Sequence, residues 1–190
     1  GNRRHRRRRR RWRRRGRSGE PSAGLHRTKT RTLAKLRGAL LPVAAYLIKA
    51  GAAALLSPQT GALAVCLVQY SLLFLFLLLN HRRPVWPLFA FAGTLMNFLV
   101  IALNGGCMPV AASLLGQGER LAQLAQGRVY AYCLADASTR LPLLGDVIRL
   151  GSAQAPMGFA SIGDLVLCVG VGILFWQMTQ MEKKPAGEVL

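Results

Sequence analysis

Acidic residues are scarce in this chain of 190 residues, which has seven Asp and Glu against 26 Lys and Arg and a formal net charge of +19. A soluble chain this basic is normally polar throughout, yet 52% of the residues here are apolar. The apolar segments also lack the strict alternation of apolar and polar residues that half-buried strands show. These features disfavour a soluble enzyme, a compact nucleic-acid-binding domain and a disulfide-rich secreted module.

Motifs of familiar catalytic and cofactor chemistry are missing as well. The sequence contains no P-loop, no dinucleotide-binding glycine pattern, no His-Glu-x-x-His and no Cys-x-x-Cys. It also contains no Gly-x-Ser-x-Gly. The three histidines, His5, His26 and His81, are scattered along the chain, so they predict neither a haem nor a zinc site. We therefore expect no cofactor and no metal, and we lean against an enzyme while leaving that class open.

Most of the positive charge lies at the beginning of the chain. Residues 1–37 hold 17 of the Lys and Arg and one acid, Glu20. Like charges at this density repel each other and bury no apolar surface, so we predict a disordered cytoplasmic tail. Binding of the tail to anionic lipid headgroups is a second interpretation. Binding of nucleic acid or the ribosome through phosphate contacts is a minor alternative.

The rest of the chain contains four apolar runs, and a helix needs about 20 apolar residues to cross a bilayer. Their bounds are 39–56, 61–79, 85–103 and 159–178. The first run is interrupted by Pro42 and Lys49, and turn-forming or charged residues follow each run. We therefore predict an all-α fold, an integral membrane helical bundle of about four transmembrane helices over residues 38–181.

Charges beside the spans predict the orientation. If four spans alternate, the tail and the basic pairs at 82–83 and 183–184 all fall on one side. By the positive-inside rule this side is cytoplasmic. We therefore predict a multi-pass cell-membrane protein whose N-terminal tail and C-terminal tail (182–190) are cytoplasmic. The long segment 104–158 is then extracytoplasmic, and we expect it to be helical and irregular.

Each predicted span contains one strongly polar residue, and such residues are costly within a membrane. The four residues are Lys49, Gln69, Asn97 and Asp164. At 1.5 Å per residue they lie at similar depths, about 7–12 Å from the outer ends of their spans. This placement predicts one polar layer with Lys49 and Asp164 as its ion pair, and the layer is a candidate binding site for a substrate, a proton or an ion.

A simpler interpretation of the same residues is packing and capping. Ser161 and Asp164 have the spacing of a capping box, in which each side chain binds the backbone N–H of the other residue. Lys49 would then extend to the outer interface. Gln69 and Asn97 would form hydrogen bonds between helices. We favour this interpretation but keep the polar layer as an alternative.

The outer segment contains two further candidate features. Asp136, Arg140 and Asp146 could bind an anionic headgroup or hold the segment on the bundle, and the second role is the simpler one. Cys107 and Cys133 could form a disulfide if this side is oxidising.

Three short motifs in and beside the outer segment resemble a known family. Residues 104–110 are Asn-Gly-Gly-Cys-Met-Pro-Val, residues 139–148 are Thr-Arg-Leu-Pro-Leu-Leu-Gly-Asp-Val-Ile, and residues 159–164 are Phe-Ala-Ser-Ile-Gly-Asp. Their turn and motif positions include Asn104, Gly105, Gly106, Met108, Pro109, Ser161 and Gly163. In order and spacing they resemble a domain-of-unknown-function family of small bacterial multi-pass membrane proteins, over roughly residues 31–180.

The resemblance implies an integral membrane protein without an established activity, so it implies no catalytic residue. Members usually have one more apolar helix before the basic segment that corresponds to residues 31–37, where this chain has the arginine tract. The absence of that helix leads us to expect either four or five spans in the complete protein.

We expect a structural or accessory component of the bacterial cell membrane. One alternative is a small oligomeric transporter, or a transporter subunit, that uses the polar layer. Another is a membrane enzyme that acts on lipid headgroups at the outer face. The expected partners are membrane lipids, further copies of the chain or a larger membrane complex.

Overall fold

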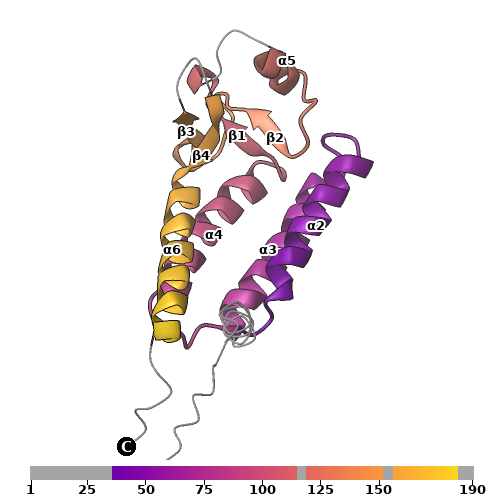
Figure 1. The fold of residues 1–190 in the computed structure, drawn as a ribbon. Helices are drawn as coiled ribbons and strands as arrows, with labels where there is room; N and C mark the ends of the chain where they lie inside the picture. Colours follow the sequence, from indigo (N-terminus) through magenta and orange to yellow (C-terminus); the bar gives the residue numbers. More distant parts are fainter. Residues whose placement is uncertain (1–35, 115–118, 152–155, 184–190) are drawn as a thin grey trace, which may run out of the picture.

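The computed structural model describes residues 36–114, 119–151 and 156–183 (Figure 1). Residues 1–35 and 184–190 lie outside the described residues. The predictions of a disordered tail, and of lipid, nucleic acid or ribosome binding by that tail, therefore fall on residues that the structure does not describe.

Four long helices occupy the four predicted spans. Their bounds are α2, Leu40–Leu55; α3, Ala62–Leu79; α4, Trp86–Leu103; and α6, Ile162–Lys183. Three apolar stretches are long enough to cross a membrane, namely all of α3, all of α4 and the part of α6 from residue 162 to residue 180. The remaining helix, α2, has 16 residues and is a shorter apolar helix. The structure is therefore compatible with a membrane protein that has three membrane-length helices, one fewer than predicted.

The outer segment differs from the prediction, because it forms a four-stranded sheet in the order β2-β1-β3-β4. The strands are β1, Met108–Val110; β2, Tyr132–Leu134; β3, Asp146–Gly151; and β4, Pro156–Ser161. β1 runs parallel to β2 and β3, whereas β3 and β4 are antiparallel. The short helix α5, Glu119–Ala125, and two single 3-10 turns, Ala112–Leu114 and Pro142–Leu144, complete the segment.

The all-α prediction is therefore wrong for the outer segment, and the fourth predicted span began too early. Residues 159–161 complete β4, and helix α6 starts at Ile162. The sequence did not reveal the sheet, because β1 and β2 have three residues each, too few to show an alternating pattern. β1 also contains Pro109, which lacks a backbone donor and argues against a strand.

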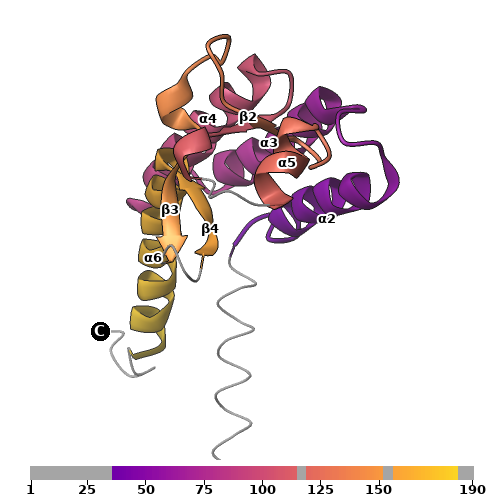
Figure 2. The same cartoon turned by 90° about the horizontal axis from the view of Figure 1, so that it is seen from above.

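The helices form two pairs beneath the sheet (Figure 1). α2 lies against α3, α4 lies against α6, and α3 and α4 connect the pairs. The view from above shows α5 on the side of α2 and α3, and β3 and β4 over the start of α6 (Figure 2). The sheet and α5 thus form a cap at one end of the bundle, and the connection between α3 and α4 lies at the other end.

Small residues bring α4 and α6 close together. A Cβ atom at Gly93 of α4 would lie 2.5 Å from the carbonyl oxygen of Gly163 in α6. One at Gly170 would lie 2.6 Å from the backbone nitrogen of Ala90. Small residues allow helix backbones to approach in this way in membranes, where packing rather than water expulsion drives association.

Candidate functional site

The most buried polar cluster joins α4, the end of β4 and the start of α6. Asn97 is 6% exposed and Ser161 is fully buried. The Asn97 Nδ2 donates a hydrogen bond of 2.6 Å to Oδ1 of Asp164. The Ser161 hydroxyl donates one of 2.8 Å to Oδ1 of Asn97. Three side chains from three elements therefore bind one another.

The same cluster caps helix α6. The Asp164 carboxylate accepts a hydrogen bond of 2.9 Å from the backbone N–H of Ser161 through Oδ2. The Ser161 hydroxyl oxygen accepts one of 2.9 Å from the backbone N–H of Asp164. This reciprocal geometry is that of a capping box. Both carboxylate oxygens of Asp164 are thus engaged, and the arrangement holds the sheet on the bundle.

Lys49 and Gln69 lie apart from this cluster, between α2, α3 and the cap. The Lys49 ammonium is 5.6 Å from the centre of the Tyr132 ring, a cation–π distance. Lys49, Gln69 and Tyr130 line a cavity of about 10 Å³. The described residues contain no ion pair between Lys49 and Asp164, in contrast to the expected pairing. The four polar residues of the predicted spans therefore form two groups. Asn97 and Asp164 lie at the α4–α6 pair. Lys49 and Gln69 lie at the α2–α3 pair.

Asp146 begins β3 and is 5% exposed. Its side chain accepts no hydrogen bond from the part of the chain that the structure describes. It lines a cavity of about 520 Å³ between the sheet and α5, together with Tyr132 and Phe159. The pKa of the Asp146 carboxyl is raised to about 6, mainly because it is buried and also because Asp164 is near, while Lys49 opposes the rise.

Asp136 and Arg140, the other candidates in the cap, lie in an exposed turn. The Asp136 carboxylate accepts hydrogen bonds of 2.8 Å and 2.7 Å from the backbone N–H and hydroxyl of Ser138. These bonds hold the pKa of Asp136 below its ordinary value. Arg140 is held through its backbone, whose N–H donates to Oδ1 of Asn104 at 2.9 Å and whose carbonyl accepts from Nδ2 of Asn104 at 2.8 Å.

The first sequence motif forms the joint between bundle and cap. Besides binding Arg140, the Asn104 side chain donates a hydrogen bond of 2.7 Å to the carbonyl of Val100 at the end of α4. Gly105 and Gly106 have φ values of +71° and +92°, which favour glycine. A side chain at Gly106 would also collide with the backbone at the start of α3. The remaining motif positions, Met108 and Pro109, are buried in β1.

Residues 34–176 match the family model of DUF5317, a family of unknown function. The chain belongs to the DUF5317 family. The predicted resemblance to a domain-of-unknown-function family is thereby confirmed. No curated protein and no solved structure matches the chain.

The two cap cysteines of this DUF5317 chain lie side by side as free thiols. The hydrogen bond between them lowers the pKa of Cys107 to about 7 and raises the pKa of Cys133. The Cys107 thiol also donates a hydrogen bond of 2.7 Å to Oε1 of Gln59, in the connection between α2 and α3. The predicted disulfide is not formed in this structure, although Cys133 packs against the cluster of buried residues that contains Cys107.

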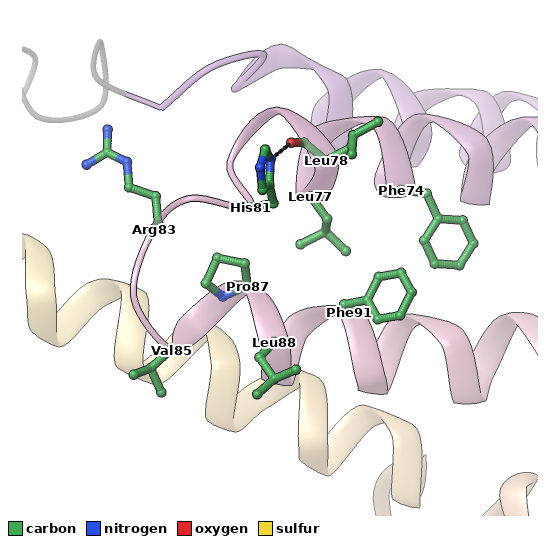
Figure 3. A pocket seen from close by; sticks show the side chains of 9 residues that line it. All are labelled: Phe74, Leu77, Leu78, His81, Arg83, Val85, Pro87, Leu88 and Phe91. Carbon is green, nitrogen blue, oxygen red and sulfur yellow. Dashed lines mark hydrogen bonds between the residues drawn. The ribbon is translucent and has the colours of Figure 1, made fainter.

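The opposite end of the DUF5317 bundle carries an apolar groove of about 330 Å³ that the sequence did not predict. Figure 3 shows Phe74 and Leu77 of α3 across from Leu88 and Phe91 of α4, with Arg83 beyond one end of the groove. A neighbouring cavity of about 490 Å³ is lined by basic and loop residues. These are Arg37, Leu78, Leu79, Asn80, His81, Arg82 and Arg83. Among the described residues, no Asp or Glu lines either hollow.

Proposed function

We propose that this protein is a structural or accessory component of a bacterial cell membrane. The observation that carries the proposal is the cluster of Asn97, Ser161 and Asp164, in which every side chain binds another member. Intramembrane polar groups that satisfy one another stabilise helix packing and offer little to a solute. Here they join two helices to the cap.

The geometry favours this role over the transporter alternative. A polar layer that carries a solute should line a shared path, but Lys49 and Gln69 border a cavity of about 10 Å³. That volume holds no more than about one water molecule. Asn97 and Asp164 contribute to a different cluster, and α4 and α6 pack tightly around it.

The geometry gives the headgroup enzyme less support as well. Catalysis by two carboxylates requires them to converge on one reacting group. Asp136 and Arg140 lie in an exposed turn, whereas Asp146 is buried beneath α5.

Charge at the two ends supports the orientation that we propose. Arg37, Arg82 and Arg83 gather at the end with the α3–α4 connection. The segment 104–158, which forms the cap at the other end, has four Arg and three acidic residues and thus a net charge of only +1. Following the positive-inside rule, we place the termini and this connection in the cytoplasm and the cap outside.

Membrane lipids are the partner that we propose for the basic end. An acyl chain fits the apolar groove between α3 and α4, and the arginines beside it suit an anionic headgroup. The outward side of α6 also exposes large apolar residues, with Phe175 at 61% and Trp176 at 62%. Lipid, a second copy of the chain or a larger membrane complex would cover this surface.

The orientation is tested by labelling single cysteines with a membrane-impermeant maleimide, in a variant whose four natural cysteines are replaced by alanine. Ser138→Cys in the cap should be labelled in intact cells. His81→Cys at the basic end should be labelled only after the cells have been permeabilised. The reverse pattern would contradict the proposed orientation, and release of the chain by alkaline carbonate would contradict membrane integration.

The structural role is tested by the stability of the purified protein in detergent. Asn97→Ala should lower the melting temperature clearly, because it removes the partner of the Ser161 hydroxyl group and of Oδ1 of Asp164. The matched change Gln69→Ala, whose amide forms no hydrogen bond within the described residues, should have a smaller effect. Equal effects would argue against a structural cluster at Asn97.

A further inference from the structure

The cap contains a largely buried acidic residue, Asp146, whose side chain borders a cavity and has no partner among the described residues. Asp146 is 5% exposed, and its side chain forms no hydrogen bond or ion pair with the described residues. A buried polar group without a partner costs free energy, and a buried charge costs more. The expected resolution is a partner from outside the described fold.

The charges that the structure describes near this site are unbalanced. Among the described residues, Asp164 raises the pKa of Asp146 and Lys49 lowers it. The oxygens of Asp164 are bound by Asn97 and by the backbone of Ser161. Lys49 contacts Tyr132 and forms no ion pair with Asp146 among the described residues. Among the described side chains, two carboxylates thus face one ammonium, and one further positive charge would balance them.

The space beside Asp146 has the size and lining of a small-molecule pocket. Its volume is about 520 Å³, within the usual range of roughly 300–1,000 Å³. The wall is mostly apolar, with two aromatic rings. The lining residues are Val110, Leu124, Val129, Tyr132 and Phe159, together with Gln123, Asp146 and Gly158.

We propose that this pocket binds an organic ammonium ion, a protonated amine attached to an apolar body. The ammonium would donate hydrogen bonds to the Asp146 carboxylate, and the apolar body would pack against Val129, Leu124 and Phe159. Aromatic rings attract cations, which adds to the selectivity for positive charge. This inference goes beyond the proposed structural role and does not depend on it.

Two observations favour an organic cation over a metal ion. The described residues contain no group of three or more His, Cys, Asp or Glu side chains that could hold a metal. Ca²⁺ and Mg²⁺ need several oxygen ligands, and the described lining residues of the pocket include one carboxylate among mostly apolar side chains. With a pKa of about 6, Asp146 is mainly ionised at pH 7 and is able to accept hydrogen bonds from an ammonium group.

The proposal is tested by titrating the purified full chain in nanodiscs with benzylammonium chloride by calorimetry. Benzyl alcohol, which is neutral and of similar size, controls for partition into lipid. The matched variants are Asp146→Asn, which keeps the side-chain shape, and Asp136→Asn, which removes an exposed carboxylate of the same cap. Val129→Trp fills the pocket and keeps the carboxylate.

We expect saturable benzylammonium binding that is weakened at least about tenfold by Asp146→Asn and by Val129→Trp. Asp136→Asn should leave benzylammonium binding unchanged. Benzyl alcohol should give the same signal with Asp146→Asn as with the original chain. Melting temperatures of all variants establish that each is folded. Absence of saturable benzylammonium binding, or equal binding by the original chain and a folded Asp146→Asn variant, would overturn the proposal. The orientation and stability tests above would stand in either case.

Discussion

The Asn97 amide donates a hydrogen bond of 2.6 Å to the carboxylate of Asp164, which is 67 residues further along the chain. This bond crosses the close interface between α4 and α6, where Gly93 and Gly163 let the two backbones approach. Ser161 completes the cluster from the end of β4. The three residues thus connect α4 and α6 with the end of the sheet.

Asn97→Ala should lower the free energy of unfolding by roughly 1–3 kcal/mol, because Asp164 and Ser161 each lose a buried partner. Thermal unfolding in detergent, followed by circular dichroism, measures the effect. In a double-mutant cycle, Asn97→Ala and Ser161→Ala should couple strongly, because the two residues share one cluster. Additive costs would show that the cluster does not act as a unit.

Lys49 should couple to Tyr132 more strongly than to Asp164. A cation–π contact is worth about 0.5–1 kcal/mol at exposed sites and more when it is shielded from water. The cycle of Lys49→Met with Tyr132→Leu, measured by thermal unfolding, should reveal that energy. Tyr132→Phe keeps an aromatic ring and serves as the control. A larger coupling of Lys49→Met with Asp164→Asn would instead support the ion pair expected from the sequence.

Stability should depend on pH through Asp146. Its pKa is raised from 3.8 to about 6 in the folded protein, so the folded state binds this proton at a higher pH than the unfolded chain does. As the pH rises from 3.8 through about 6, the Asp146 contribution makes the folded state progressively less stable. Below this range Asp146 is protonated in both the folded and the unfolded state, and above it Asp146 is ionised in both.

Asp146→Asn should remove this contribution and raise the melting temperature at pH 7 by a few degrees. Melting temperatures of both proteins in detergent between pH 4.5 and 7.5 provide the measurement. Asp136→Asn is the control, because hydrogen bonds lower the pKa of Asp136 and its titration falls below this range. An unchanged pH slope in Asp146→Asn would assign the dependence to other groups.

Mild oxidation of the folded protein should join Cys107 and Cys133, because the two free cysteines pack in one cluster. The disulfide is detected when neither thiol reacts with maleimide after oxidation and both react again after treatment with a reductant. Replacement of Cys66 and Cys168 by alanine should not affect it. Cys133→Ser should leave Cys107 available after denaturation. Continued labelling of both cap thiols after oxidant treatment would contradict the expected bond.

The sequence predicted the helices well because long apolar runs have few alternatives. The run that became α3 ends at Asn80, whose amide donates to the carbonyls of Phe76 and Arg37. The capping interpretation of Ser161 and Asp164 was also available, because a capping box depends on contacts between residues three apart. Local interactions of this kind can be inferred from residue order alone.

The sheet and the grouping of polar residues could not be inferred in the same way. β1 pairs with β2 across more than 20 residues, and its three residues carry no periodic signal. The expected polar layer combined Lys49 with Asp164 because depth in the membrane is readable from the sequence. The position of a residue around the bundle cannot be inferred from the sequence. In the structure, Lys49 and Asp164 belong to different helix pairs.

The sequence by itself determined the apolar helices, the basic end beside Arg82 and Arg83, and membership of a family of unknown function. Hydropathy and local charge suffice to predict these features, because both properties depend on residues within a few turns of one helix. The tertiary structure alone decided that Asp146 is buried and unpaired beside a pocket among the described residues. Burial and pairing depend on strands and helices that meet from distant parts of the chain.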